Sequence, residues 1–423
     1  MERWLIQSIM ISVFGFLKDF RPEDPYIIQY LTSSPMNFTI EEIIQEIFPV
    51  STYTCVNVTI IIFLVTDYLH YKPILVFGAI SSVISQIFLI FARTKTNMQI
   101  MDFFDGIMIA CDIPYYTYIY TAVDKKHYKI VSSHMNMACL IGRFSSAVLA
   151  QTLIDNHILK VQHLNYLTLT GTTLSLLWAI GLPSVQKSLY FHQGTEKKKK
   201  ITDIDTSKPK NVFQILWLDF ITAFTNHNVL QWSICWILGT YFYYQFMSYC
   251  QSLYQQIYYD GTDLQITNNG MVEAIYTITS TLGVYFVGII RIPSWWLVGI
   301  LTLCQGLILM VMAQEHLLSY AYLGYILFGT FYHIMITIAN CEVAKNIPAD
   351  CYALVFGINT FTSHLLQTCV TIVVNSPIGL MLNIRTQFYL YGLSYLIIGF
   401  VYTINALRST ISRTRIQDIF TIA

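Results

Sequence analysis

Apolar stretches of about 20 residues recur along the whole chain, and this repetition most constrains its fold. A helix needs about 20 mostly apolar residues to cross the hydrocarbon core of a bilayer. Of the 423 residues, 55% are hydrophobic and only 11% are charged, whereas about 25% charged is ordinary for soluble proteins. We therefore predict an all-α membrane protein with twelve transmembrane helices. The predicted helices lie near residues 4–31, 46–66, 73–92, 99–123, 130–155, 163–185, 229–254, 267–290, 294–313, 317–343, 349–374 and 386–407.

The positions of lysine and arginine predict how the chain is oriented. Of the 24 such residues, 17 fall in segments on the same side as the N-terminus. The exceptions are four on the opposite side (Arg93, Lys95, Lys160 and Arg385) and three within predicted helices (Lys18, Arg21 and Arg143). Cytoplasmic loops carry an excess of lysine and arginine, so we expect both termini in the cytoplasm and a multi-pass protein of the plasma membrane. The first residues run directly into charged ones, which argues against a cleavable signal peptide.

One long polar stretch divides the chain. It predicts an N-terminal six-helix half at 1–185, a basic cytoplasmic linker at 186–211, and a C-terminal six-helix half with a short tail at 212–423. The run Lys197–Lys200 suits a solvated loop, and anionic lipid is its alternative partner. Residues 211–225 are expected to form a short amphipathic helix on the inner face. Two six-helix halves joined by a basic loop are typical of major facilitator transporters, whose substrate site lies between the halves.

Motifs for catalysis or metal binding do not occur in the sequence. There is no phosphate-binding loop, dinucleotide fingerprint, zinc-protease motif or nucleophile elbow. The nine cysteines are scattered without a paired spacing, so we expect neither a disulfide framework nor a metal site. These observations argue against an enzyme and against any cofactor. The sequence Asn37-Phe38-Thr39 is a predicted glycosylation site, whereas the similar sequence at Asn57 lies inside a predicted helix.

Ionisable residues inside the predicted helices are the candidate functional residues. Asp112 lies in a largely apolar stretch, where a charge costs several kcal/mol unless it lines a pathway or finds a partner. Asp102 and Asp105 lie nearer the end of that stretch, where we expect water to be close. Charged residues and two prolines also interrupt the first predicted helix, which suits a segment that lines a cavity. The remaining candidates are Arg21, Asp24, Arg143, Glu273, His333, His364 and Gln367.

Two interpretations of these residues stay open. They can form internal ion pairs that hold the two halves together, or they can bind a ligand. Carboxylates in both halves, with Tyr115 and Tyr116 close to Asp112 in sequence, favour an acidic and aromatic cavity. Such a cavity suits a flat organic cation, through charge pairing and cation–π attraction. Arg143 is expected either to pair with Asp112 or to face an inner gate.

Several sequence blocks resemble those of the vertebrate thiamine transporters and the reduced folate carrier. The most specific is YALVFGINTF at residues 352–361, near the start of the eleventh predicted helix. The supporting blocks, in chain order, are FGF at 14–16, RP at 21–22, EIFPV at 46–50, TDY at 66–68, YKP at 71–73, YY at 115–116, YIY at 118–120, VLAQ at 148–151, NG at 269–270 and VEA at 272–274. Because these blocks span the chain in order, it is identified as a member of that family.

The resemblance implies a set of substrate-binding residues and a preference for thiamine. The implied contacts are Asp24, Phe48, Ser51, Asp112, Tyr115, Ser248, Glu273 and Gln367. The folate carriers differ from this chain at three positions of the predicted cavity. The resemblance implies cationic residues in those carriers where this chain has Asp112 and Gln367, and at or beside the position of His333. An acid at Asp112 and an amide at Gln367 match the thiamine transporters, whose ligand carries a thiazolium and an aminopyrimidine. Arg21, Arg143 and His333 are candidates for gating or ion pairs.

Three departures from the family pattern leave alternatives open. Ser51 stands where the thiamine transporters have a stacking tryptophan, and Ser248 stands where they have asparagine. Arg143 adds a positive charge that does not favour a cation. The leading prediction is thiamine uptake by alternating access through the cavity. The alternatives are a carrier of folate or of another vitamin such as pyridoxine, and a receptor or scaffold that does not transport. The oligomeric state stays open, and no nucleic-acid partner is expected.

Overall fold

The residues described by the computed structural model form helices joined by turns and short connections, with no strand among them. They are 3–66, 69, 71–123, 127–183, 212–260, 268–289, 294–347, 352–376 and 379–422. The helices before residue 183, here called the N-terminal set, are α1 (Arg3–Lys18), η1 (Asp24–Tyr26), α2 (Ile27–Thr32), α3 (Ile40–Glu42), η2 (Ile43–Ile47), α4 (Phe48–Thr66), α5 (Lys72–Phe91), α6 (Lys95–Ala110), α7 (Asp112–Ala122), α8 (Tyr128–Asp155) and α9 (Val161–Gly181). Those of the C-terminal set are α11 (Val212–Thr225), α12 (His227–Asp260), α13 (Asn269–Ile289), α14 (Ser294–Gln314), α15 (Leu318–Lys345), α16 (Tyr352–Asn375) and α17 (Ile384–Ile422).

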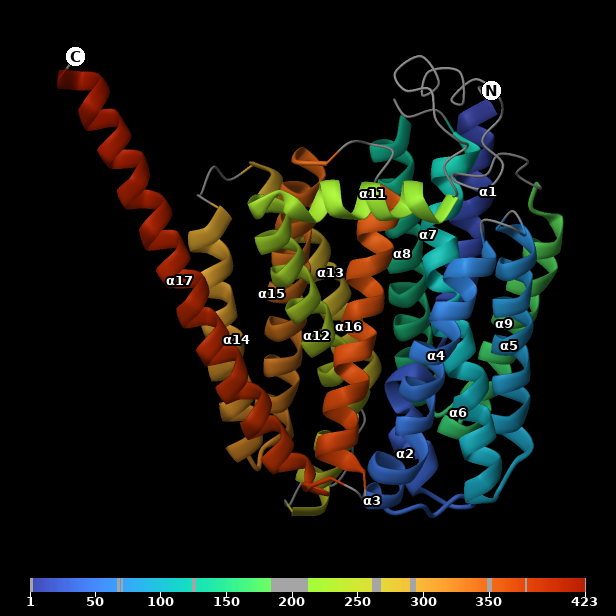
Figure 1. Cartoon of the computed structure of the whole chain (residues 1–423). Coiled ribbons are helices and arrows are strands. Elements are labelled where there is room, and N and C mark those ends of the chain that lie inside the picture. The colour runs from blue at the N-terminus through green and yellow to red at the C-terminus, as the bar shows by residue number, and fades with distance from the viewer. Residues whose placement is uncertain are drawn as a thin grey trace.

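The two sets stand side by side, with α11 lying across one end of the bundle (Figure 1). The N-terminus lies at that same end, here called the α11 end, whereas α2 and α3 lie at the opposite end, here called the α3 end. Between the sets, α8 packs against α13 and α4 packs against α16. The predicted linker at 186–211 falls outside the described residues, so the division into two halves stays a prediction.

The all-α prediction is confirmed, and most predicted membrane helices match a single helix within a few residues. The short helix expected at 211–225 is present as α11. Two predicted helices are divided, because the structure separates 4–31 into α1, η1 and α2 and separates 99–123 into α6 and α7. Two others are longer than predicted: α12 continues to Asp260, beyond the predicted end at 254, and α17 continues to Ile422, beyond the predicted end at 407. The first division follows the charged, proline-containing run that the sequence marks. The number of membrane crossings itself stays a prediction.

Pro114 accounts for the division of the fourth predicted helix. A proline inside a helix lacks an N–H group and clashes with the carbonyl four residues earlier, which here belongs to Ala110. The helix consequently ends at Ala110, and Cys111 N–H bonds both Ile107 and Met108 carbonyls at 3.2 and 3.0 Å. A new helix then begins at Asp112. The proline therefore places Asp112 in the first turn of a helix at an interruption.

The exterior of the bundle is largely apolar. Phe91, Leu307 and Phe400 are more than half exposed, at 68%, 56% and 62%, and large apolar surfaces of this kind mark membrane contact. Five helices among the described residues are long and apolar enough to cross a membrane by length and composition: Lys72–Phe91, Ser133–Asp155, Trp295–Gln314, Leu318–Lys345 and Ile384–Arg408. Helix α12 is long enough but is not among these five, because it carries many polar and tyrosine side chains.

Gly15 allows α1 and α7 to approach closely. Tyr115 is fully buried in a core cluster with Phe14 and Cys139. A Cβ atom at Gly15 would lie 2.1 Å from the Tyr115 hydroxyl oxygen and 3.0 Å from Cys139 Sγ. Because real Cβ atoms do not approach other atoms so closely, only glycine leaves room for this ring.

Gly15→Ala is expected to destabilise the protein. Overpacking of a well-packed core costs about 1–3 kcal/mol, and here the Tyr115 ring would have to move. The measurement is the melting temperature of the purified protein, with Gly181→Ala as the matched control, because a Cβ atom at Gly181 meets nothing within 4 Å. Equal melting temperatures for the two variants would contradict this account.

Candidate binding cavity between the two sets of helices

The break after α1 concentrates charged side chains where the two sets meet. Helix α1 ends at Lys18, and a short 3-10 turn begins at Asp24. Pro22 and Pro25 interrupt the helix, but two backbone bonds tighten the turn: Asp24 N–H to the Arg21 carbonyl at 3.3 Å and Tyr26 N–H to the Glu23 carbonyl at 2.8 Å. The turn is thus ordered by its own backbone, and its side chains are available to neighbouring helices.

Asp112 is paired with Lys18. The Lys18 Nζ atom lies 2.5 Å from Asp112 Oδ1 and 3.2 Å from Asp19 Oδ1. It also lies 5.3 Å from the centroid of the Tyr115 ring. The Lys18 side chain is 15% exposed, whereas that of Asp112 is 40% exposed. The carboxylate therefore faces open space on one side and a buried cation on the other.

Arg143 pairs with Asp19. Its Nε atom donates to Asp19 Oδ2 at 3.4 Å, so the expected pair of Arg143 with Asp112 is not formed. Lys18 holds the position next to Asp112 that was expected for Arg143. We call Lys18, Asp19, Asp112 and Arg143 the charged cluster; with all four ionised, its net charge is zero.

Arg21 links the break to α6. Its Nη1 atom lies 3.6 Å from Asp105 and 4.0 Å from Asp24, and its Nη2 donates to Ser82 Oγ at 3.0 Å. The expectation that Asp102 lies close to water is wrong. Asp102 is only 5% exposed, and its Oδ2 atom has no hydrogen-bond partner among the described residues. A helix end in the sequence is thus not a water-exposed position here, because α4 packs along α6.

A cavity of about 240 Å³, here called the acidic cavity, lies between the two sets. Its lining includes Asp24, whose side chain is 59% exposed, and Glu273 from α13. The lining as a whole is Asp19, Arg21, Asp24, Pro25, Arg143, Ser146, Met247, Gln251, Tyr254, Asn269, Val272, Glu273 and Tyr325. Four predicted residues (Asp24, Glu273, Arg21 and Arg143) therefore come together in one cavity, and Asp19 connects it to the charged cluster.

Glu273 has a neutral partner. The Tyr325 hydroxyl donates to Glu273 Oε2 at 2.5 Å, and no lysine or arginine among the described residues lies within 4.0 Å of this carboxylate. A second hydroxyl network lies on the same set of helices, where the Tyr276 hydroxyl oxygen is 2.7 Å from His333 Nε2 and 2.9 Å from the Tyr243 hydroxyl oxygen. His333 thus belongs to a network of hydroxyl groups, with no ion pair among the described residues.

The remaining predicted contacts on the C-terminal set lie on α12 and α16. Ser248 Oγ donates to the Tyr244 carbonyl at 2.8 Å, one turn earlier in its own helix. The Tyr244 ring stacks on His364, with centroids 4.7 Å apart. His364 Nδ1 lies 3.5 Å from Gln367 Oε1, and Gln367 is 5% exposed. Helix α16, which carries His364 and Gln367, contacts α7, the helix that begins at Asp112.

The predicted aromatic contacts Tyr115 and Phe48 do not line the acidic cavity. Tyr115 is fully buried, whereas Tyr116 is 43% exposed. Phe48 is partly buried and packs against core clusters of both sets. Ser51 lies one turn further along α4, where its carbonyl oxygen would be 2.5 Å from a Cβ atom at Gly106. In this structure Tyr116, and not Tyr115, is the exposed ring next to Asp112.

The start of α13 is capped by side chains of the N-terminal set. The first N–H groups of a helix have no partner within the helix. Here the Gly270 N–H donates to the Tyr26 hydroxyl at 3.2 Å and the Met271 N–H donates to Gln151 Oε1 at 3.0 Å. The Tyr26 hydroxyl in turn donates to Gln151 Oε1 at 2.7 Å. Asn269 Nδ2 donates to the Pro25 carbonyl at 2.7 Å. These contacts join the sets on the α3 side of the acidic cavity.

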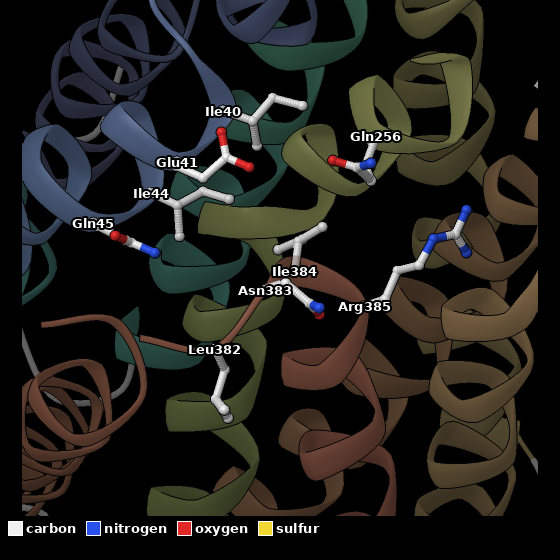
Figure 2. A pocket seen from close by; sticks show the side chains of 9 residues that line it. All are labelled: Ile40, Glu41, Ile44, Gln45, Gln256, Leu382, Asn383, Ile384 and Arg385. Carbon is white, nitrogen blue, oxygen red and sulfur yellow. The ribbon is translucent and has the colours of Figure 1, made fainter. Parts of the chain in front are cut away.

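A second pocket, of about 160 Å³, lies at the α3 end and contains none of the predicted substrate contacts (Figure 2). Glu41 and Gln45 border it on the N-terminal set, and Arg385 borders it on the C-terminal set. Arg385 is already bonded to Asp260 Oδ2 at 3.0 Å and to the Ala313 carbonyl at 2.8 Å. We therefore assign this pocket to the junction of the sets and not to ligand binding.

Asn37, the predicted glycosylation site, is exposed in the connection between α2 and α3 and has a positive φ of 52°. The helices α2 and α3 that flank this connection lie at the α3 end (Figure 1). This position is accessible, as glycosylation requires, and the modification stays a prediction.

Sequence reasoning missed the partners of the charged groups. Lys18 and Asp19 were identified only as part of an interruption, and Tyr325 was not singled out among the 30 tyrosines. Two adjacent opposite charges at the end of an apolar helix were an available signal for Lys18 and Asp19. For Tyr325 and Tyr276 the sequence offered no signal, since most tyrosines on α12 and α15 pack in the core.

Known proteins match the sequence over almost its whole length. The family described as reduced folate carrier matches residues 2–390. Thiamine transporter 1 of Mus musculus is 32% identical, with 99% of this chain and 92% of that protein covered. Thiamine transporter 2 of Homo sapiens is 29% identical, with 98% and 92% covered. Folate transporter 1 of Caenorhabditis elegans is 30% identical, with 97% and 94% covered.

Solved structures of transporters share the fold. A POT family transporter in complex with a thioalcohol-conjugated peptide superposes with a TM-score of 0.67 at 12% identity, covering 95% of this chain and 96% of that chain. The inward-open xylose transporter XylE from E. coli gives 0.64 at 11% identity, covering 94% and 95%. The predicted major facilitator fold is confirmed by this likeness.

Tyr26→Phe is expected to expose the start of α13. The change removes the acceptor of the Gly270 N–H, so this amide should exchange with solvent deuterium faster. Loss of one hydrogen bond is worth about 0.5–1.5 kcal/mol, which corresponds to a several-fold change in local opening. The measurement is hydrogen–deuterium exchange of a peptide that contains Gly270 and Met271.

Tyr30→Phe is the matched control for this experiment. The Tyr30 hydroxyl donates to the Leu89 carbonyl within the N-terminal set, so its loss should not affect α13. Equal exchange of the Gly270 peptide in both variants would show that Tyr26 does not cap this helix.

Proposed function

The chain belongs to the reduced folate carrier family, and from this premise we propose that it carries thiamine across the plasma membrane by alternating access. The observation that carries the choice of substrate class is the acidic cavity, in which Glu273 and Asp24 come from opposite sets of helices. A cationic ligand between these carboxylates would interact with both sets at once. The vitamin-transporter relatives named above support the same substrate class.

The chemistry of the cavity fits a thiazolium joined to an aminopyrimidine. Glu273 lies without a close cationic partner among the described residues and bears a single hydrogen bond from Tyr325, so it can face the fixed positive charge. Asp112 accepts hydrogen bonds, which suits the N–H donors of an aminopyrimidine. Tyr116 is exposed beside it. Burial of charges in a water-poor cavity strengthens each of these interactions.

The proposed orientation follows from the basic residues. The α11 end would face the cytoplasm, with both termini, and the α3 end with Asn37 would face outward. The contacts of Tyr26 and Gln151 with α13 would then close the outer side. In this arrangement the halves at 1–185 and 212–423 move relative to each other around the cavity. The protein is proposed to transport without catalysing a reaction.

Side-by-side uptake of labelled thiamine, folate and pyridoxine in cells that express the chain tests the proposal. Thiamine uptake above that of cells with the empty vector is the expected result. Uptake of folate or pyridoxine alone would assign the chain to the alternative carriers. Surface expression without uptake of any of the three would support a receptor or scaffold.

Glu273→Gln is expected to reduce thiamine uptake per surface molecule at least tenfold. The substitution keeps the shape and the bond from Tyr325 but removes the charge that would face the thiazolium. The measurement is initial uptake divided by surface abundance. Glu342→Gln is the matched control on α15, because Glu342 pairs with Lys345 near the α11 end. A loss of surface abundance with normal uptake per molecule would make Glu273 a structural residue.

Asp112→Arg is expected to abolish thiamine uptake, and Asp112→Glu to retain part of it. Arginine would place a second cation beside Lys18 in a region of low dielectric constant, where like charges repel strongly. Glutamate preserves the hydrogen-bond acceptor, with one extra methylene. The measurement is again uptake per surface molecule. Parental uptake by a normally expressed Asp112→Arg variant would exclude Asp112 from ligand binding.

A further inference from the structure

Lys18 already occupies one side of the carboxylate that was predicted to meet the ligand. It contacts Asp112 Oδ1 at 2.5 Å, and it is held in place by Asp19 at 3.2 Å and by the Tyr115 ring at 5.3 Å. With 15% of its side chain exposed, Lys18 is not a solvated surface residue. Asp112 therefore does not present an uncompensated negative charge.

We propose that Lys18 is the resident counter-ion of Asp112 and a specificity-determining residue of the charged cluster, which adjoins the acidic cavity through Asp19. It leaves Asp112 free to accept hydrogen bonds from neutral N–H groups, such as the edge of an aminopyrimidine or a carboxamide. It disfavours a ligand that places a positive charge at Asp112. This inference rests on the proposed function and refines it, because it assigns the two ends of the ligand to different carboxylates.

The geometry leaves one oxygen of Asp112 for the ligand. Lys18 donates to Oδ1, whereas Oδ2 accepts no hydrogen bond from the residues that the structure describes, and the side chain is 40% exposed. A neutral donor at Oδ2 would gain a charge-assisted hydrogen bond, which is about twice as strong as a neutral one. A cation at the same place would lie within roughly 6 Å of Lys18 Nζ, where repulsion at an effective dielectric constant of about 20 is enough to weaken binding more than tenfold.

The second carboxylate, Glu273, has the opposite character. Its partner is the neutral Tyr325 hydroxyl, and it faces the acidic cavity together with Asp24. Two further charges, Asp19 and Arg143, also line this cavity and pair with each other at 3.4 Å. The two carboxylates thus differ. Asp112, which lies outside the lining of the acidic cavity, is paired with Lys18, whereas Glu273 in the lining has no lysine or arginine within 4.0 Å among the described residues. A ligand with a neutral donor at one end and a fixed cation at the other matches this difference.

The test compares two probes of the same shape that differ in charge, benzamidinium and benzamide. Their apparent affinities are measured by thermal-shift titration of the purified full-length protein. Lys18→Gln removes the charge but keeps a donor for Asp112 and Asp19. It is expected to bind benzamidinium at least tenfold more tightly than the parent does, and to bind benzamide within threefold of the parent. Lys18→Met is expected to behave in the same way and serves where Lys18→Gln does not fold.

Three further variants locate the effect. Lys18→Arg keeps the positive charge and should show no gain for benzamidinium. Lys18→Gln combined with Asp112→Asn should lose the gain, since the carboxylate is absent. Lys95→Met is the matched control, because Lys95 also bridges two carboxylates, Glu42 at 3.4 Å and Glu46 at 2.9 Å, at the α3 end, and it should change neither affinity.

An equal change for both probes, or no gain for benzamidinium in folded Lys18→Gln or Lys18→Met, would overturn the proposal. So would a gain that persists without the Asp112 carboxylate. The titration does not depend on thiamine transport. A failure of the proposed function would appear in the uptake assay and would leave this result standing.

Discussion

Charged residues at the break in the first helix must find partners inside an apolar bundle, and the arrangement of the cavity depends on how they do so. An unpaired charge in such surroundings is costly. Lys18, Asp19 and Arg21 reach three other helices, through Asp112 on α7, Arg143 on α8 and Asp105 on α6. These pairs fix the end of α1 relative to the N-terminal set. They also leave Glu273 as the one carboxylate of the cavity lining that has no lysine or arginine within 4.0 Å among the described residues.

The sequence predicted the fold well, because the fold depends on a repeated property of many residues. Apolar length placed nearly every helix, and the interruption after Lys18 was visible as a run of charge and proline. Pro114 was also visible, but its effect on the helix was not anticipated, since prolines in membrane helices are often accommodated. The all-α class and the major facilitator fold could therefore be predicted without coordinates.

For the candidate site, the sequence could predict which residues line the cavity but not how they pair. Asp24 and Glu273, far apart in the chain, do line one cavity. The partner of each charge could not be predicted, because pairing depends on side-chain direction across helices and not on spacing along one helix. Thus pairing with Asp112 was one of the two positions expected for Arg143, which pairs with Asp19. Similarly, Tyr115 is buried whereas Tyr116 is exposed. Resemblance to a family transfers positions, but it does not transfer the environment that surrounds them.

The capping of α13 by Tyr26 and Gln151 has a consequence for the energy of opening. When the sets separate on this side, water can replace both protein partners, so the N–H groups of Gly270 and Met271 stay hydrogen-bonded in either arrangement. The net difference for each bond is then about 0.5–1.5 kcal/mol, about half of the roughly 1–3 kcal/mol that an unsatisfied buried group would cost. These two bonds would therefore oppose opening only weakly, on a scale that the differential binding energy of a small ligand is large enough to offset.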